Sequence, residues 1–82
     1  MRFVDRKIGK NELAELAKER FGDMVKAVVD IRLGVMMLGA DLHADEEAAL
    51  LERGSRQEDL WGINIYVHKP LNERIEFDSM II

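Results

Sequence analysis

A strict alternation of apolar and polar residues after the single tryptophan is the feature that most constrains the fold of this chain. Residues 61–68 read WGINIYVH, in which every second side chain from Trp61 to Val67 is apolar. A period of two is typical of a β-strand with one face buried. Such a strand needs a neighbour, and the nearest apolar run, 48–52, is separated from it by a polar stretch that contains Gly54. We therefore predict a β-hairpin over residues 50–67.

The residues before this segment also suit a helix. Asp45 is a favourable capping residue, the glutamates that follow it suit a first helical turn, and Gly54 suits a helix end. We favour a strand at 48–52, because the strand that begins at Trp61 requires a partner, and a helix over 45–53 stays the alternative.

The N-terminal part predicts a short strand at 2–7 and a helix at 10–21. Gly9 precedes the helix with Glu12 three residues later, as in a weakened capping box, and Gly22 suits the position that ends it. One apolar stripe at helical spacing contains Leu13, Leu16, Ala17 and Phe21.

Residues 24–43 favour a second hairpin. The run MVKAVVDI is rich in β-branched residues, Val35 to His43 alternates, and Gly34 between them suits a turn. One long helix over 24–38 remains the alternative, because no proline interrupts it.

After Pro70, which marks a loop, residues 75–82 alternate again as a strand. The chain stops within this strand, so we expect that the strand pairs with another subunit or that a natural tail is missing.

Length and composition predict one domain over residues 1–82. A chain of 82 residues supports a single core, and it has no cysteine, no signal peptide and no apolar run long enough to cross a bilayer. We expect a cytoplasmic protein. The net charge of −4 disfavours nucleic acid as a partner. Residues 41–59 contain seven carboxylates, which form either a solvated acidic region or a surface for a cation or a basic partner. They are Asp41, Asp45, Glu46, Glu47, Glu52, Glu58 and Asp59.

These elements predict an α+β fold in which an N-terminal helix packs on an antiparallel sheet of four to five strands, connected largely by hairpins. One helix covers only part of such a sheet. The uncovered face would carry Val35, Met37, Met80 and Ile82. We therefore expect a homo-oligomer, most simply a dimer, formed by sheet-face packing or by edge pairing of the last strand.

Two groups of polar residues are candidates for a site. Asn64, Tyr66, His68 and Asp78, together with Glu76, would form a polar patch on the open side of the sheet, suited to binding a small polar ligand or to acid–base chemistry. His43 and Asp45 point to the same side of a strand and suit a divalent metal, with further ligands from His68 or Asp78. The simpler interpretation of both groups is a solvated surface, and no cofactor is predicted.

The segments RFGDMVKAVVDI, LGADLHADEE, LLERGSRQEDLWGINIY and IEFDSMI resemble, over most of the chain, a family of short prokaryotic hypothetical proteins classed as a domain of unknown function. Members of that family continue past the last strand with an asparagine-isoleucine-arginine-proline segment and often a further helix. The resemblance supports the fold and implies no activity and no catalytic residues.

No nucleophile-elbow, phosphate-loop, dinucleotide-binding, zinc-protease or EF-hand motif occurs in the sequence. Two hypotheses for function follow. The first is a small non-catalytic binding or interaction protein that acts as a homo-oligomer. The second is a small enzyme or metal-binding protein that uses the histidines and their neighbouring carboxylates, so whether the protein is an enzyme stays open.

Overall fold

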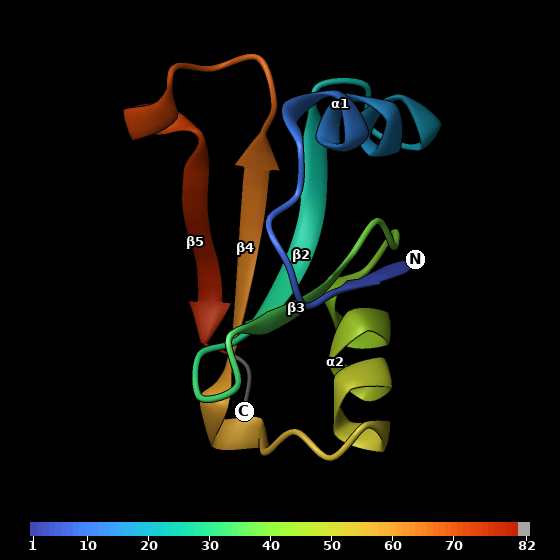
Figure 1. Cartoon of the computed structure of the whole chain (residues 1–82), viewed down its shortest axis with the longest axis vertical. Coiled ribbons are helices and arrows are strands. Elements are labelled where there is room, and N and C mark those ends of the chain that lie inside the picture. Colours follow the sequence, from blue (N-terminus) through green and yellow to red (C-terminus); the bar gives the residue numbers. More distant parts are fainter. Residues whose placement is uncertain (81–82) are drawn as a thin grey trace.

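A five-stranded antiparallel sheet with a helix on each face forms the domain (Figure 1). The computed structural model describes residues 1–80. The strand order is β1-β3-β2-β4-β5, and every neighbouring pair is antiparallel, which confirms the predicted α+β class. The strands are β1 (Arg2–Val4), β2 (Met24–Asp30), β3 (Val35–Leu38), β4 (Leu60–Tyr66) and β5 (Ile75–Met80). The helices are α1 (Lys10–Glu19) and α2 (His43–Glu52), with short 3-10 turns η1 (Gln57–Asp59) and η2 (Leu71–Glu73).

The second predicted hairpin is confirmed as β2 and β3, which pair directly, so the alternative of one long helix is wrong. Gly34 has a φ of 70°, a left-handed conformation that glycine adopts without steric cost. Its N–H donates to the carbonyl of Asp30 at 2.9 Å. The carboxylate of Asp30 also accepts the backbone N–H groups of Arg32 and Leu33, both at 2.9 Å, and so holds the turn.

The two helices cover opposite faces of the sheet and different halves of it. Ala27 and Val28 are neighbours in β2, so their side chains point to opposite faces. Ala27 belongs to the apolar cluster that contains Leu16 of α1, whereas Val28 packs with Leu50 of α2. In Figure 1, α1 lies at the upper end of β2, α2 lies near the lower end, and β1 and β3 pass between them. Half of each face of the long strands is therefore left without a helix.

The predicted strand at 48–52 is wrong, and so is the hairpin over 50–67. Residues 43–52 form α2, and a turn and η1 connect it to β4. β4 has its neighbours elsewhere: it pairs with β2 on one side and with β5 on the other. The polar stretch before β4 is structural, as Ser55 shows by donating its hydroxyl to the carboxylate of Asp30 at 2.6 Å.

The remaining elements agree with the sequence within a few residues. α1 ends at Glu19, and the N–H of Gly22, which has a φ of 87°, donates to the carbonyl of Ala17 at 2.7 Å. The first strand is shorter than the predicted 2–7, and β4 ends at Tyr66. The last strand is present as β5, and Ile82 lies outside the described residues.

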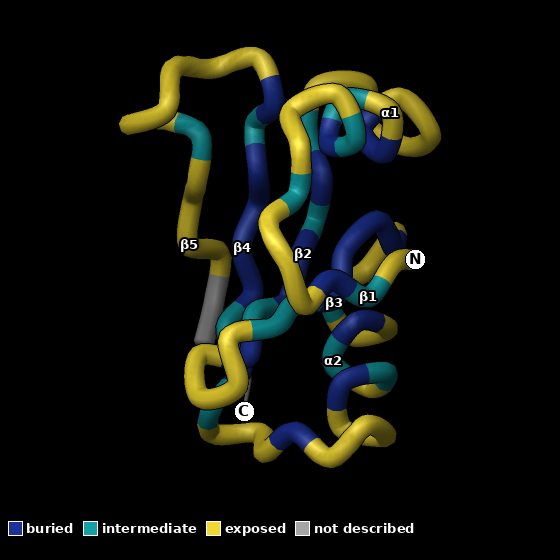
Figure 2. Tube along the Cα trace, in the orientation of Figure 1, coloured by how far each residue is buried: buried dark blue, intermediate teal, exposed yellow. Residues whose placement is uncertain are grey.

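The prediction of the uncovered face is wrong for two of its residues. Met37 is buried in the cluster under α2, and Val35 packs against the same cluster, because the second helix covers this part of the sheet. The side chain of Met80 and the whole of Ile82 lie outside what the structure describes. Figure 2 shows that exposed surface instead follows β5, while the neighbouring β4 is buried along most of its length.

Among the described residues, no helix is long and apolar enough to cross a membrane.

Candidate functional site

Three polar side chains meet on the α2 side of the sheet, in the half that the helix leaves open. Asn64 lies directly opposite Glu76 in the β4–β5 ladder, and its side-chain amide donates to Oε1 of Glu76 at 3.1 Å. The hydroxyl of Tyr66 donates to the same oxygen at 2.9 Å. The structure thus brings together two predicted residues, Asn64 and Tyr66, around Glu76. We call these three residues the polar cluster.

The hydrogen bonds in the polar cluster determine its charge. The bonds from Asn64 and Tyr66 lower the pKa of Glu76 despite some desolvation, with a smaller contribution from the charge of Lys69. The bond to Glu76, followed by desolvation, raises the pKa of Tyr66. At neutral pH Glu76 is therefore a carboxylate and Tyr66 a neutral phenol. The ammonium of Lys69 lies 4.4 Å from the centre of the Tyr66 ring, so a cation already stands beside this cluster.

Asp78 lies at a β-bulge and points to the same side of the sheet as Glu76. Gly62 pairs with Ser79 and Ile63 with Phe77, so Asp78 has no partner on β4. Its carboxylate lies 3.3 Å from Nδ1 of His43, at the first position of α2. The predicted association of His43 with Asp78 is therefore present, although His43 lies on a helix and not on a strand.

The second ring nitrogen of His43 is also occupied. Nε2 lies 2.8 Å from the carbonyl oxygen of Ile63. A carbonyl oxygen only accepts hydrogen bonds, so Nε2 carries a proton. Nδ1 donates to Asp78 when the ring is doubly protonated. The imidazole thereby links the start of α2 to both β4 and β5.

Glu46 is a buried acid in the first turn of α2, where solvated carboxylates were expected. It lies three residues after His43 and is fully buried. Its Oε2 accepts the backbone N–H of Ala40 at 3.0 Å. Desolvation raises the pKa of Glu46 to about 8, against the opposing effects of the Ala40 N–H and the charge of Lys26. Glu46 is therefore neutral at pH 7. The only sequence signal was its spacing from His43, which places both on one side of a helix.

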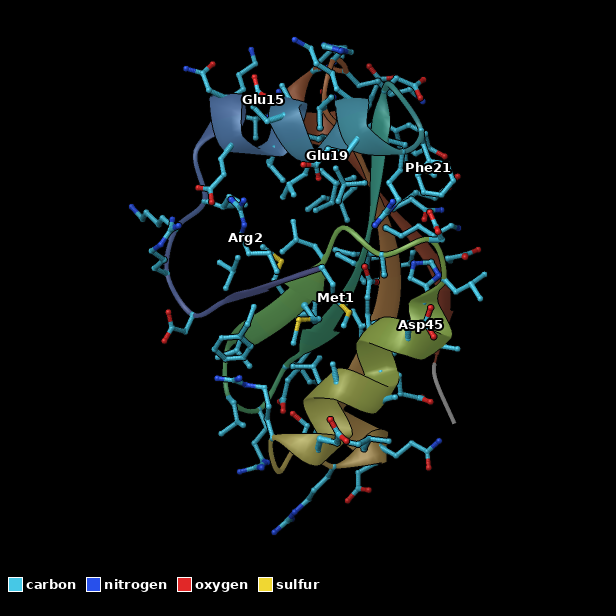
Figure 3. All side chains as sticks on the ribbon, turned by 90° about the vertical axis from the view of Figure 1, so that its right-hand side faces the viewer. Met1, Arg2, Glu15, Glu19, Phe21 and Asp45 are labelled. Carbon is cyan, nitrogen blue, oxygen red and sulfur yellow. The ribbon has the colours of Figure 1, made fainter. Side chains whose placement is uncertain are left out.

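Two predicted residues lie apart from these groups. Asp45 is on another side of α2, where it lines an open groove of about 450 Å³ together with Asp41, Glu52 and Arg20. Figure 3 shows Asp45 on α2, facing the region near Met1 below α1. Arg20 pairs with Asp41 at 3.2 Å. His68 is exposed in the turn after β4 and is not part of the strand.

The histidine and acidic side chains of these groups do not form a metal site by themselves. Within the part of the chain that the structure describes, no three histidine, cysteine or acidic side chains are arranged to hold a metal ion. His43 and Asp78 are two adjacent ligands, and Asp45 does not join them because it faces the groove.

On the α1 side of the sheet, the side chains along β5 and the adjoining part of β4 are apolar. Its side chains lie on one face by register, since Val29 pairs with Trp61, Ile63 with Phe77 and Ile65 with Ile75. The rings of Trp61 and Phe77 meet edge to face with their centres 6.0 Å apart. The ladder continues past β2, because the N–H of Ile31 donates to the carbonyl of Asp59 at 3.0 Å. We call Ile31, Trp61, Ile75 and Phe77 the apolar strip.

The fold and these surfaces define a small α+β domain with two uncovered half-faces, one polar and one apolar. The chain belongs to a family described as protein of unknown function (DUF5674), whose model matches residues 2–82. No curated protein and no solved structure matches the chain.

Proposed function

We propose that the protein is a small non-catalytic binding protein that acts as a homodimer. The observation that carries this proposal is the apolar strip, in which Phe77 is 71% exposed, Ile31 62% and Ile75 56%. At about 200 Å² for a large apolar side chain, these residues and Trp61 present roughly 400 Å² of apolar surface. A stable interface buries about 800 Å² per partner and is a little more than half apolar. The strip therefore supplies most of the apolar part of one interface.

The chemistry of the polar residues supports binding over catalysis. The ring nitrogens of His43 face the carbonyl of Ile63 and the carboxylate of Asp78, so the imidazole links α2 to the sheet instead of facing an open cavity. Glu76 is a weak base, because its hydrogen bonds lower its pKa. A carboxylate held by two donors keeps its second oxygen as an acceptor, which suits recognition of a polar or cationic ligand. The net charge of −4 opposes nucleic acid as that ligand.

Light scattering coupled to gel filtration tests the homodimer. Phe77→Glu places a charge in the strip, and we expect it to weaken dimerisation by about tenfold or more, the usual cost at a central interface residue. Leu71→Glu is the matched control, because Leu71 is 82% exposed in η2 and lies outside the strip. The control should dimerise as the wild type does. A wild-type protein that is monomeric at every concentration would contradict the proposal.

The second candidate is a metal-binding protein or small enzyme that uses His43 and Asp78. The observation in its favour is that the carboxylate of Asp78 lies 3.3 Å from Nδ1 of His43. Buried oxygen atoms of Glu47 and Asn64 without a hydrogen-bond partner in the described structure add acceptors on the same side of the sheet. A divalent ion would have to replace the direct contact between His43 and Asp78.

Thermal unfolding with zinc, manganese, nickel or calcium separates the two candidates. Metal binding predicts a melting temperature that rises with metal concentration in the wild type and in Asp45→Asn, and is constant in His43→Ala. A melting temperature that no metal changes eliminates the metal-binding protein.

A further inference from the structure

We infer that the polar cluster binds a free α-amino acid, whose ammonium group contacts Glu76 and Asn64 and whose carboxylate contacts Lys26. This inference rests on the proposed binding function and names the class of its ligand. The site is a row of three side chains that crosses the neighbouring strands β2, β4 and β5 (Figure 1). We call Lys26, Asn64 and Glu76 the cross-strand row.

The register of the sheet forms the cross-strand row. Lys26 on β2 lies directly opposite Asn64 on β4, which lies directly opposite Glu76 on β5. Residues opposite each other share a face. This face is the α2 side, because Val28, two residues after Lys26, packs with Leu50 of α2. Neighbouring strands are about 4.8 Å apart, so the backbones of Lys26 and Glu76 are roughly 10 Å from each other. A cation, an amide and an anion therefore follow one another across the sheet.

Asn64, in the middle of the row, has an oxygen atom without a donor. The residue is 7% exposed, and its Nδ2 donates to Glu76 at 3.1 Å. Because a carboxylate only accepts hydrogen bonds, this contact fixes which end of the amide faces Glu76. Oδ1 is therefore turned away from Glu76, and it is buried without a hydrogen-bond partner among the described residues. Such an acceptor costs free energy, which a ligand with N–H donors would recover.

Glu76 supplies the negative charge of the site. Its Oε1 accepts the hydrogen bonds of Asn64 and Tyr66, which leaves Oε2 as a second acceptor. The two donors lower the pKa of the carboxyl group, so Glu76 is ionised at neutral pH. The neighbouring Lys69 stacks over the Tyr66 ring and forms no ion pair with Glu76 in the described structure. An ammonium group has three N–H donors, enough for Oε2 of Glu76 and Oδ1 of Asn64.

Lys26, at the other end of the row, is a cation without a carboxylate partner. Its side chain makes no ion pair with any described residue, and its Nζ lies 5.6 Å from the centre of the Phe21 ring. Glu46 of α2 is close enough for the charge of Lys26 to lower its pKa, but burial raises that pKa to about 8. Glu46 is therefore neutral at pH 7, and the ammonium of Lys26 is available to an anionic group.

The order of these charges selects the ligand. A simple amine would use the acceptors of Glu76 and Asn64 and leave Lys26 unpaired, whereas a simple carboxylate would be repelled by Glu76. An α-amino acid carries an ammonium group and a carboxylate on one carbon atom, so it complements both ends of the row at once. Both contacts would be charge-assisted hydrogen bonds, which are about twice as strong as neutral ones.

Isothermal titration calorimetry with free amino acids tests the site. The panel covers small, apolar, aromatic, acidic and basic side chains, and ethylamine and acetate are the ligands with a single charge. We expect at least one amino acid to bind about tenfold or more tightly than either of them. Lys26→Met should weaken the binding of that amino acid about tenfold but not the binding of ethylamine. Glu76→Gln should weaken it by a similar factor but not the binding of acetate. Lys18→Met is the matched control, because Lys18 is exposed on α1.

The outcomes separate this inference from the proposed homodimer. The amino-acid site is overturned, and the homodimer is not, if no amino acid binds more tightly than ethylamine and acetate. It is also overturned if Lys26→Met and Glu76→Gln are folded by circular dichroism and bind the amino acid as Lys18→Met does. Binding to a wild type that light scattering shows to be monomeric supports the site and contradicts the homodimer. If Lys26→Met does not fold, Glu76→Gln and the comparison of the three kinds of ligand decide.

Discussion

The two helices are of equal length and are attached to the sheet by different kinds of contact. The buried residues of α1 are Leu13, Leu16 and Ala17, so its buried contacts are apolar, and its ion pair between Glu12 and Arg2 of β1 lies at the exposed surface. The buried residues of α2 are Glu46 and Leu50, and the half-buried His43 stands at its start. α2 is thus held by one leucine in its second half and by hydrogen bonds at its first turn. The comparison shows that buried apolar surface stabilises one side of the sheet, whereas hydrogen bonds between particular groups stabilise the other.

The largest effect should come from removing the apolar contact of α2. Leu50 is fully buried in the smaller of the two apolar clusters, so Leu50→Ala should lower the free energy of unfolding by about 3 kcal/mol, within the usual range of about 2–5 kcal/mol. Leu16→Ala in α1 should cost a similar amount. Leu51→Ala is the control, since Leu51 is 38% exposed. Urea unfolding measures all three, and a Leu50 variant no less stable than the Leu51 variant would show that α2 does not depend on this contact.

The same difference explains which helix could be predicted from the sequence. The buried side of α1 repeats leucine and alanine at helical spacing, and Gly22 marks its end. The buried side of α2 places a histidine and a glutamate where an apolar residue is expected. Their partners are the carbonyl of Ile63 and the N–H of Ala40, and no periodicity of the sequence reveals such contacts. The local signals, Asp45 and Gly54, suited a helix, but the expected need of β4 for a neighbouring strand outweighed them, and in the structure β2 and β5 meet that need.

Asp30 is a further polar contact on the α2 side, because its carboxylate connects the loop after α2 to the sheet. Burial raises the pKa of Asp30, but hydrogen bonds from Ser55, Leu33 and Arg32 outweigh this and lower its pKa overall. Asp30→Ala leaves these donors without a partner and should cost about 2–3 kcal/mol. Because the folded-state pKa lies below the unfolded-state value, the stabilisation is present above the unfolded pKa and is lost as the pH falls through the folded pKa. Chemical denaturation between neutral and acidic pH measures both effects, and Ser55→Ala should reproduce only part of the loss. Equal stability of Asp30→Ala and wild type at pH 7 would contradict this account.

The candidate site was also only partly predictable. The alternation in β4 and β5 placed Asn64 and Tyr66 on one face, and the structure joins them through Glu76. The same pattern failed for His68, because the chain turns after Tyr66. The alternation also placed Asp78 on the face of Glu76, but the geometry of its contact with His43 was not predictable, because His43 begins a helix and was expected on a strand.

Glu46 provides a pH test with the opposite sign. Its pKa is raised to about 8, so the folded protein binds a proton that the unfolded protein has lost at pH values above the ordinary glutamate value of 4.5. The free energy of unfolding should therefore fall as the pH rises from about 5 to 8, and then level off. Glu46→Gln keeps an acceptor for the N–H of Ala40 and cannot ionise, so at pH 9 its free energy of unfolding should exceed that of the wild type. An identical pH dependence for the two proteins would show that ionisation of Glu46 does not lower the free energy of unfolding.

The smallest of these effects should come from the link between His43 and the strands. His43→Ala removes the hydrogen bond to Ile63 and the contact with Asp78 of a side chain that is 14% exposed, and we expect it to lower the free energy of unfolding by about 1 kcal/mol. Asp78→Asn should cost less, because Asp78 is 48% exposed and solvent screens its charge. A double-mutant cycle measures their coupling, which should be about 0.5 kcal/mol.

Amide exchange on the same variants locates the effect. A structural link predicts faster exchange in the first turn of α2 while α1 is unchanged, since α1 has no polar contact of this kind among its buried residues. If the coupling is absent and exchange in α2 is unaltered, the start of α2 is held by Glu46 and Leu50 alone, and His43 and Asp78 are then free to bind a ligand.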